Sequence, residues 1–248
     1  MKSWTDVLGC EPDQYSDRVY STRPEWVSGH ISHHDARFLF RRLLETGPDV
    51  VIEVGTASGV STAILCHAAH MASAARDGSS DFKVHSYDIS THFYADMEKR
   101  VGDAAREMLD DDLLERIRFH APATASTVRE QHRPDTIEFA FIDASHKHPW
   151  PVLDLLAMLA CLRPGGDVLL HDINLPRMVE GNEVFGAQLL YEGLDVEKEA
   201  DGEAPIPNIG RIRIPDDKAG LREELLALID AHDWETEPHP EQIRIALG

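Results

Sequence analysis

The stretch from Val50 to Leu65, VVIEVGTASGVSTAIL, constrains the fold of this chain more than any other. Its first five residues are apolar and β-branched apart from one acid, which is typical of a strand buried on both faces. Five small residues, Gly55 to Gly59, then predict a sharp turn, and from Val60 the apolar spacing is helical. In doubly wound sheets, ligands bind where such a strand ends and the next helix begins. The turn is therefore a predicted ligand site.

The spacing of the glycines and one acid restrict the ligand. No lysine follows Gly59, as a phosphate loop requires, and Ala57 stands where a dinucleotide loop has glycine, which disfavours a nicotinamide dehydrogenase. Glu53 would repel a pyrophosphate but suits a cationic group, and the free amides at the helix start can hold a carboxylate. S-adenosylmethionine carries an ammonium, a sulfonium and a carboxylate. The alternative is an ordinary tight turn without a ligand.

Three further motifs support this ligand through a family resemblance. Glu53-x-Gly55-x-x-x-Gly59 resembles motif I of the class I S-adenosylmethionine-dependent methyltransferases. LRPGG at 162–166 is common in that class, and FIDASH at 141–146 with LLHD at 169–172 resembles the subgroup of macrolide sugar O-methyltransferases and cephalosporin hydroxylase. The resemblance covers about Leu39 to Ile214. It implies an α/β, Rossmann-like, doubly wound and mostly parallel seven-stranded sheet with an antiparallel closing strand, which we assign to Ile209–Ile214.

A second acid completes the predicted cofactor site. Lys83–Asp88 reads as the second strand, and a carboxylate at its tip can accept both hydroxyls of a ribose. The alternative is an exposed acid at a strand end. The predicted cofactor-binding residues are Glu53, Gly55, Thr56, Ala57, Ser58, Gly59, Ser61, Thr62, Asp88, Ala123 and Asp143.

A histidine is the predicted catalytic base. His146 lies three residues after the fourth predicted strand, Thr136–Asp143, and a neutral imidazole can take the proton of an alcohol. His148 and His171 are the reserves, and Asp143 either contacts the donor or steers His146. The alternative is that His146 only bonds to the loop backbone. The tetrad [DNS]PP[YF] of many amino-group and nucleobase methyltransferases is absent, which favours an oxygen or carbon acceptor.

A divalent metal is the other way to activate the acceptor. The resemblance to catechol-type enzymes implies magnesium held by one acid after strand four and two neighbours after strand five. Asp143 and Asp172 match, but Ile173 follows Asp172 and cannot be a ligand. His171 is the substitute that we predict, and a nitrogen ligand would favour Mn²⁺, Fe²⁺ or Zn²⁺ over Mg²⁺.

These residues predict S-adenosylmethionine-dependent methyl transfer to an oxygen, less so a carbon, of a small natural product or sugar. Two alternatives stay open: a hydroxylase or other reaction on the same scaffold, since a fold does not fix a reaction, and a non-catalytic subunit that binds the donor. The acceptor itself is not readable from the sequence.

Charge and composition bear on the partners. The formal net charge of −20, from 44 acids and 24 bases, disfavours nucleic acid and anionic membranes and favours a small-molecule acceptor. The three cysteines have no CxxC spacing and no apolar run has membrane length, so we expect a reduced, cytoplasmic protein. Homo-oligomerisation is left open.

The predicted organisation is an irregular N-terminal arm at 1–31 that covers the site and has room for a short helix near Thr5, a methyltransferase domain at 32–215, and a tail at 216–248. The tail carries an amphipathic helix and an alternating run, Gln242–Leu247, and either joins the domain or contacts another copy. Within the domain, Thr91–Leu109 predicts one helix with Met97 and Val101 facing inward. Ser32 and Asp35 predict a capping box at a helix start, and Arg163–Gly166 predicts a turn before the fifth strand. Further helices are predicted at Thr127–His132, at Pro149–Leu162 with Pro151 in its first turn, at Asn182–Gly193 and at Leu221–Ala231.

Overall fold

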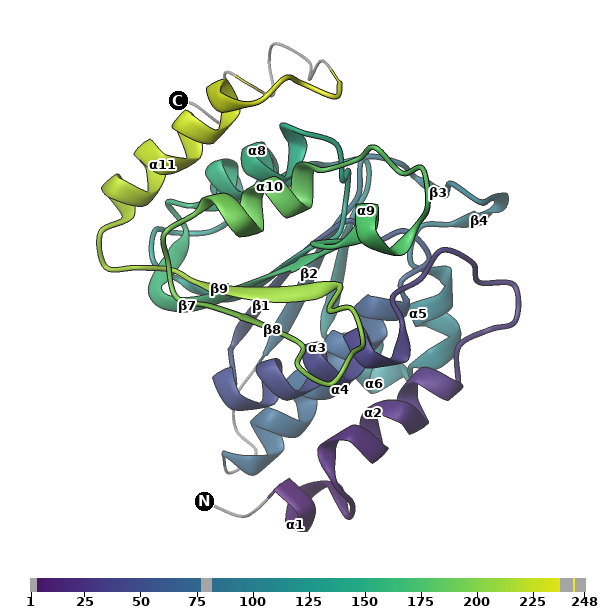
Figure 1. The fold of residues 1–248 in the computed structure, drawn as a ribbon. Helices are drawn as coiled ribbons and strands as arrows, with labels where there is room; N and C mark the ends of the chain where they lie inside the picture. Colours follow the sequence, from purple (N-terminus) through teal and green to yellow (C-terminus); the bar gives the residue numbers. More distant parts are fainter. Residues whose placement is uncertain (1–3, 77–81, 237–242, 244–248) are drawn as a thin grey trace. The chain divides into compact units, whose positions relative to one another are not determined.

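The computed structural model describes residues 4–76, 82–236 and 243, and the chain divides into two compact units, Met1–Pro122 and Ala123–Gly248. Seven strands form one sheet in the order β5-β2-β1-β6-β7-β9-β8, with helices around it (Figure 1). The predicted Rossmann-like, mostly parallel sheet with an antiparallel closing strand is confirmed.

The first unit contributes three parallel strands: β1 (Val50–Val54), β2 (Lys83–Tyr87) and β5 (Ile117–His120). Parallel pairing requires crossover connections, and the helical segments between these strands supply them. The register pairs Glu53 with Ser86 on the neighbouring strand. The ends of β1 and β2 therefore lie side by side, as the sequence predicts.

Four helices of the first unit pack on one another: α1 (Trp4–Leu8), α2 (Pro12–Ser21), α3 (His33–Thr46) and α4 (Val60–Ala75). Ser32 and Asp35 form the predicted capping box at the start of α3, and Gly47 ends the helix in a left-handed conformation. Most of α4 is buried, because small and apolar residues occupy every face of the helix.

The N-terminal arm differs from the expectation that it is irregular, because α2 is a regular helix of ten residues. Glu11 and Pro12 start it, and proline is favoured in a first turn. Its acids pair with arginines of α3, as in Asp17–Arg37 at 2.5 Å and Asp13–Arg41 at 2.8 Å. These partners are distant in sequence, so local apolar periodicity does not reveal the helix.

The predicted helix at 91–109 is wrong. The segment forms a short hairpin, β3 (His92–Phe93) and β4 (Asp96–Arg100), followed by α5 (Asp103–Met108) and α6 (Asp111–Leu114). Met97, expected inside, is 67% exposed, whereas Val101 is buried as predicted. Gly102 separates hairpin from helix at φ +80°, and any side chain there would collide with the Phe119 ring. A continuous helix cannot pass through that conformation.

The second unit contributes β6 (Ile137–Ile142), β7 (Leu162–His171), β8 (Lys198–Ala200) and β9 (Ile209–Arg213). β6 and β7 are parallel, whereas β9 runs antiparallel to both β7 and β8. The LRPGG segment, expected as a turn before the strand, is part of β7 and shifts the β6–β7 register between Ile137 and Phe139. The assignment of Ile209–Ile214 to the antiparallel strand is confirmed.

The helices of this unit include a short one that the sequence does not predict, α9 (Leu175–Met178). The others correspond to predicted helices and are α7 (Val128–Gln131), with a 3-10 turn, η1 (Ala125–Thr127), before it, α8 (Trp150–Met158), α10 (Gly186–Gly193) and α11 (Lys218–Ala231). In Figure 1, α8 and α10 lie together, and α11 packs on both. Apart from residue 243, the run at 242–247 lies outside the described residues.

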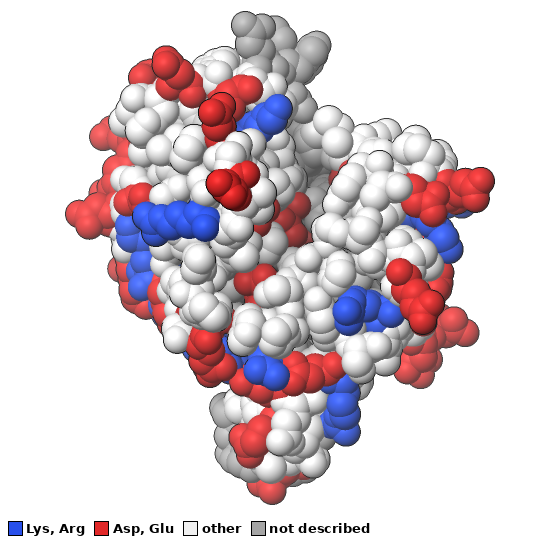
Figure 2. Space-filling model, turned by 45° about the vertical axis from the view of Figure 1, so that its right-hand side comes forward, with Lys and Arg blue, Asp and Glu red and all other residues white. Residues whose placement is uncertain are grey.

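Acidic side chains outnumber basic ones over the face in Figure 2, in line with the net charge of −20. Within the described ranges, none of the helices combines the length and the apolarity needed to span a membrane.

Candidate active site

The loop between β1 and α4, Gly55–Gly59, has the strained conformation that small residues permit, and we call it the donor loop. Gly55, Ala57 and Gly59 all have positive φ, at +101°, +45° and +95°. A Cβ on Gly59 would lie 2.9 Å from the Cα of Gly102, so α5 packs directly against the loop. At its closest approach to α5, at Gly59, the loop therefore has no side chain. It leads directly into the free backbone amides at the start of α4.

Glu53, near the end of β1, stabilises the donor loop through a network of hydrogen bonds. Its side chain is fully buried and accepts hydrogen bonds of 2.5 Å from three hydroxyl groups, those of Ser61, Thr62 and Ser86. Buried charges are tolerated when they are hydrogen-bonded in this way. Ser86 also bonds to Thr56 inside the loop. The network joins β1, β2, α4 and the donor loop, and it brings together four predicted cofactor residues, Glu53, Thr56, Ser61 and Thr62.

Asp88 also holds the loop, from the end of β2. Its Oδ2 accepts the amide of Ala57 at 2.8 Å, and its Oδ1 accepts the amide of Ser90 at 2.8 Å. The side chain is only partly buried, and each carboxylate oxygen has a second lone pair. Asp88 can therefore accept further hydroxyl donors such as those of a ribose. Ser86 and the amide of Ser90 are parts of this site that strand-end reasoning does not identify.

Ala123 is also among the predicted cofactor-binding residues. It is partly buried and lies at the start of the second unit, just before η1. The structure gives its side chain no distinguishing contact, and its role stays a prediction.

The second unit gathers four titratable side chains, Asp143, His146, His171 and Asp172, which we call the acid–histidine cluster. Ligand atoms of Asp143, His146 and Asp172 all lie within 4.8 Å of one another. His146 Nε2 is 3.1 Å from Asp172 Oδ2. His171 Nδ1 lies 3.0 Å from Asp143 Oδ1 and 3.4 Å from Asp172 Oδ1. The sequence therefore identifies all four members, but His146 rather than His171 completes the set of three donors.

Two asparagines position Asp172, Asn208 directly and Asn174 through Asn208, and the sequence predicts this role for neither. Asp172 has φ +60°, a conformation that costs energy for a residue with a side chain and often marks functional sites. Asn208 Nδ2 donates to Asp172 Oδ1 at 2.6 Å. Asn174 in turn bonds to the side chain of Asn208 and to the carbonyl of Pro207. Only the pairing of β7 with β9, which are far apart in sequence, could have indicated these partners.

The loop that carries His146 is fixed from two sides. Glu235 accepts the amides of His148 and Phe185, and its own amide donates to the His148 carbonyl at 2.9 Å. Gly186 lies so close that a Cβ would be 2.5 Å from the His146 carbonyl oxygen and the His148 amide. His148 itself is fully buried, burial lowers its pKa, and its ring packs edge-on against His232. It is therefore a weaker candidate for the base than His146.

Comparisons with known proteins agree with this geometry. Residues 52–173 match a family described as a methyltransferase domain, which includes the donor loop, Asp88 and the cluster. No curated protein matches the chain significantly.

Solved structures resemble the fold at low sequence identity. The O-methyltransferase TomG of Streptomyces achromogenes, which takes part in tomaymycin synthesis and was solved with S-adenosylmethionine, has 14% identity, a TM-score of 0.53 and coverage of 82% of this chain and 90% of its own. An O-methyltransferase of Bacillus cereus with S-adenosylhomocysteine has 17% identity, a TM-score of 0.53 and coverage of 84% and 94%. The Podospora anserina methyltransferase PaMTH1 has 13% identity, a TM-score of 0.54 and coverage of 83% and 88%.

The fold is that of the class I S-adenosylmethionine-dependent methyltransferases, and the chain is an enzyme of that class. More particularly, the segment 52–173, just under half of the chain, matches the model of a methyltransferase-domain family.

Proposed function

We propose that this enzyme transfers the methyl group of S-adenosylmethionine to a hydroxyl oxygen of a small molecule. The observation that carries the proposal is the acid–histidine cluster, which offers acidic and basic groups for removing a hydroxyl proton. The solved structures that share the fold include O-methyltransferases with S-adenosylmethionine or S-adenosylhomocysteine bound, which supports both the donor and the oxygen acceptor.

On the donor side, the residues of the chain mainly bind and orient S-adenosylmethionine. Asp88 accepts the ribose hydroxyls, and the amides at the start of α4 hold the donor carboxylate. Glu53 acts through the loop, because its oxygens already accept three hydroxyl groups. Methyl transfer is an in-line displacement, so positioning the two reactants supplies most of the rate.

On the acceptor side, Asp143, His146 and Asp172 are the residues that would hold a divalent metal ion. Two carboxylates and one imidazole, all partly buried, are a suitable set of metal ligands. A nitrogen among the ligands favours Mn²⁺, Fe²⁺ or Zn²⁺. A bound ion lowers the pKa of a coordinated hydroxyl group. His171 bonds to both carboxylates and would fix their orientation.

Calorimetry tests the two halves separately. S-adenosylhomocysteine should bind the metal-free enzyme, and Mn²⁺ should bind wild type but at least tenfold more weakly to Asp172→Asn. No heat with millimolar S-adenosylhomocysteine would refute the donor assignment. Product mass then identifies the reaction: a gain of fourteen daltons, by atomic composition, marks methylation, whereas sixteen marks hydroxylation.

Chelation decides how the hydroxyl is activated. If methylation stops with a chelator and returns with Mn²⁺, the metal assignment holds. If methylation continues, His146 is the base: its Nε2 pairs with Asp172, which leaves Nδ1 to accept the proton. A non-catalytic subunit would bind the donor, and His146→Ala would not change the activity of any complex that contains it.

A further inference from the structure

We propose that the acceptor has an apolar body, a ring or an alkyl chain, that lies against four exposed apolar side chains beside the acid–histidine cluster. These are Met178, Val179, Phe185 and Ile206, which we call the apolar rim. The inference rests on the proposed function and adds the substrate class: an apolar hydroxyl compound rather than a bare sugar.

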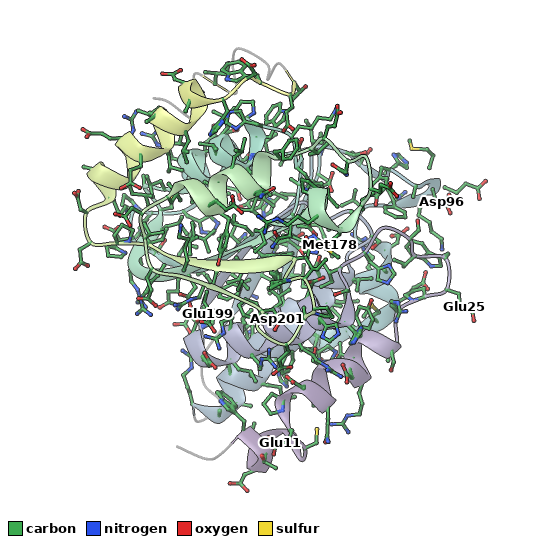
Figure 3. The ribbon with its side chains drawn as sticks, viewed as in Figure 1. Glu11, Glu25, Asp96, Met178, Glu199 and Asp201 are labelled. Carbon is green, nitrogen blue, oxygen red and sulfur yellow. The ribbon has the colours of Figure 1, made fainter. Side chains whose placement is uncertain are left out.

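The first observation is that α9 buries none of its residues. Met178 at its end and Val179 after it are each 48% exposed, and Figure 3 labels Met178. Such a short helix is not stable by itself, and polar contacts hold it: Asn174 bonds to Pro207, and Arg177 donates to Asn174 at 2.8 Å. The side chains of Met178 and Val179 thus keep nearly half of their surface exposed, and this surface is available to a ligand.

The second observation is that each rim segment is bonded to the cluster or to the loop that carries it. Ile206, 41% exposed, lies two residues before Asn208, which bonds to Asp172. Phe185, also 41% exposed, precedes Gly186, which touches the backbone of His146. The rim residues therefore lie on three chain segments, each linked by hydrogen bonds or by a close backbone contact to the cluster or to the loop that carries it.

Single exposed apolar residues are common and need no explanation, but here four of them stand on chain segments that are linked to the cluster or to the loop that carries it. The described part of the second unit exposes five large apolar side chains, and four of them form the rim. The fifth, Trp234, has a structural contact, since its indole N–H donates to the Ile229 carbonyl. Small-molecule sites combine an apolar wall with a few polar groups, as the rim and cluster do here.

The test uses 4-alkylcatechols as probes, because a vicinal diol presents two oxygens to the cluster while the alkyl chain varies. Affinity for the enzyme with S-adenosylhomocysteine and Mn²⁺ is measured by calorimetry for catechol, 4-methylcatechol and 4-propylcatechol. A buried methylene is worth ~0.8 kcal/mol, or about fourfold in affinity, so a half-buried chain should gain about twofold per carbon. Methyl glucoside, a polar vicinal diol, should bind at least tenfold more weakly than 4-propylcatechol.

Variants assign the gain to the rim. Met178→Gln and Phe185→Gln should flatten the dependence on chain length and leave the affinity for S-adenosylhomocysteine unchanged. Met97→Gln, an equally polar change at an exposed methionine of the first unit, should keep the dependence. Equal affinity for all three catechols, the absence of binding by all of them, or an unchanged dependence in both rim variants would overturn the inference. Binding of S-adenosylhomocysteine in the same samples shows that such a failure concerns the acceptor and not the donor assignment.

Discussion

Replacing Thr62 by valine tests the role of the Glu53 network. Thr62 is fully buried, and its hydroxyl donates to Glu53 at 2.5 Å. Valine has nearly the same shape, so the change removes one charge-assisted hydrogen bond and little packing. Such a bond contributes about 1.5–3 kcal/mol. Glu53 keeps the hydroxyls of Ser61 and Ser86, so we expect the protein to fold and to lose about 2 kcal/mol of stability.

Urea unfolding measures this loss. With a slope of ~2–3 kcal/mol per molar, the midpoint should fall by about 0.7–1 M without a change in slope. Thr136→Val is the matched control, because the Thr136 hydroxyl is exposed and donates only to the Arg133 carbonyl. It should cost less than about 1 kcal/mol. Equal midpoints for the two variants would refute the idea that buried hydroxyls stabilise the Glu53 charge. Weaker binding of S-adenosylhomocysteine by Thr62→Val alone would connect the network to the donor loop.

Three further changes have defined outcomes. Burial raises the pKa of Asp154 from 3.8 to about 7, so between these pH values the folded protein keeps a proton that the unfolded chain has lost. The free energy of unfolding should therefore fall by ~1.4 kcal/mol per pH unit between pH 4 and 7. Asp154→Asn should flatten that fall when unfolding in urea is measured at several pH values. Gly186→Ala should displace the loop it touches and lower the melting temperature, whereas Gly202→Ala, where a Cβ meets nothing within 4 Å, should not. In Mn²⁺ calorimetry, His146→Gln should weaken binding more than His171→Gln, because a lost ligand costs more than a lost orienting bond.

The parts of the fold that the sequence predicted correctly depend on local patterns. The β-branched run at 50–54 is a buried strand, Ser32 and Asp35 cap α3, and Pro151 lies in the first turn of α8. Each of these signals is complete within a few neighbouring residues, because caps, turns and strand composition act over that range. The positions of Glu53 and Asp88 at adjacent strand ends follow from the same patterns.

The hairpin at 92–100 shows where such patterns fail. Val101, Ala104 and Ala105 are buried and have helical spacing, which made one long helix plausible. The decisive contacts are distant: Phe93 packs against Trp26, and Gly102 fits against Phe119. Apolar spacing describes one element at a time and contains no information on these partners, so tertiary contacts override it.

Long-range contacts also decide which histidine, His146 or His171, completes the set of three metal ligands with Asp143 and Asp172. His171 ends β7, where strand geometry fixes its side chain, and its ring nitrogen already bonds to Asp143. His146 lies in a loop, and the sequence does not give the course of a loop. The contacts of Glu235 and Gly186 bring His146 to Asp172, and both residues are at least 40 positions further along the chain. The more accessible imidazole is therefore the one set by long-range contacts, while the one set by the strand is left to orient the carboxylates.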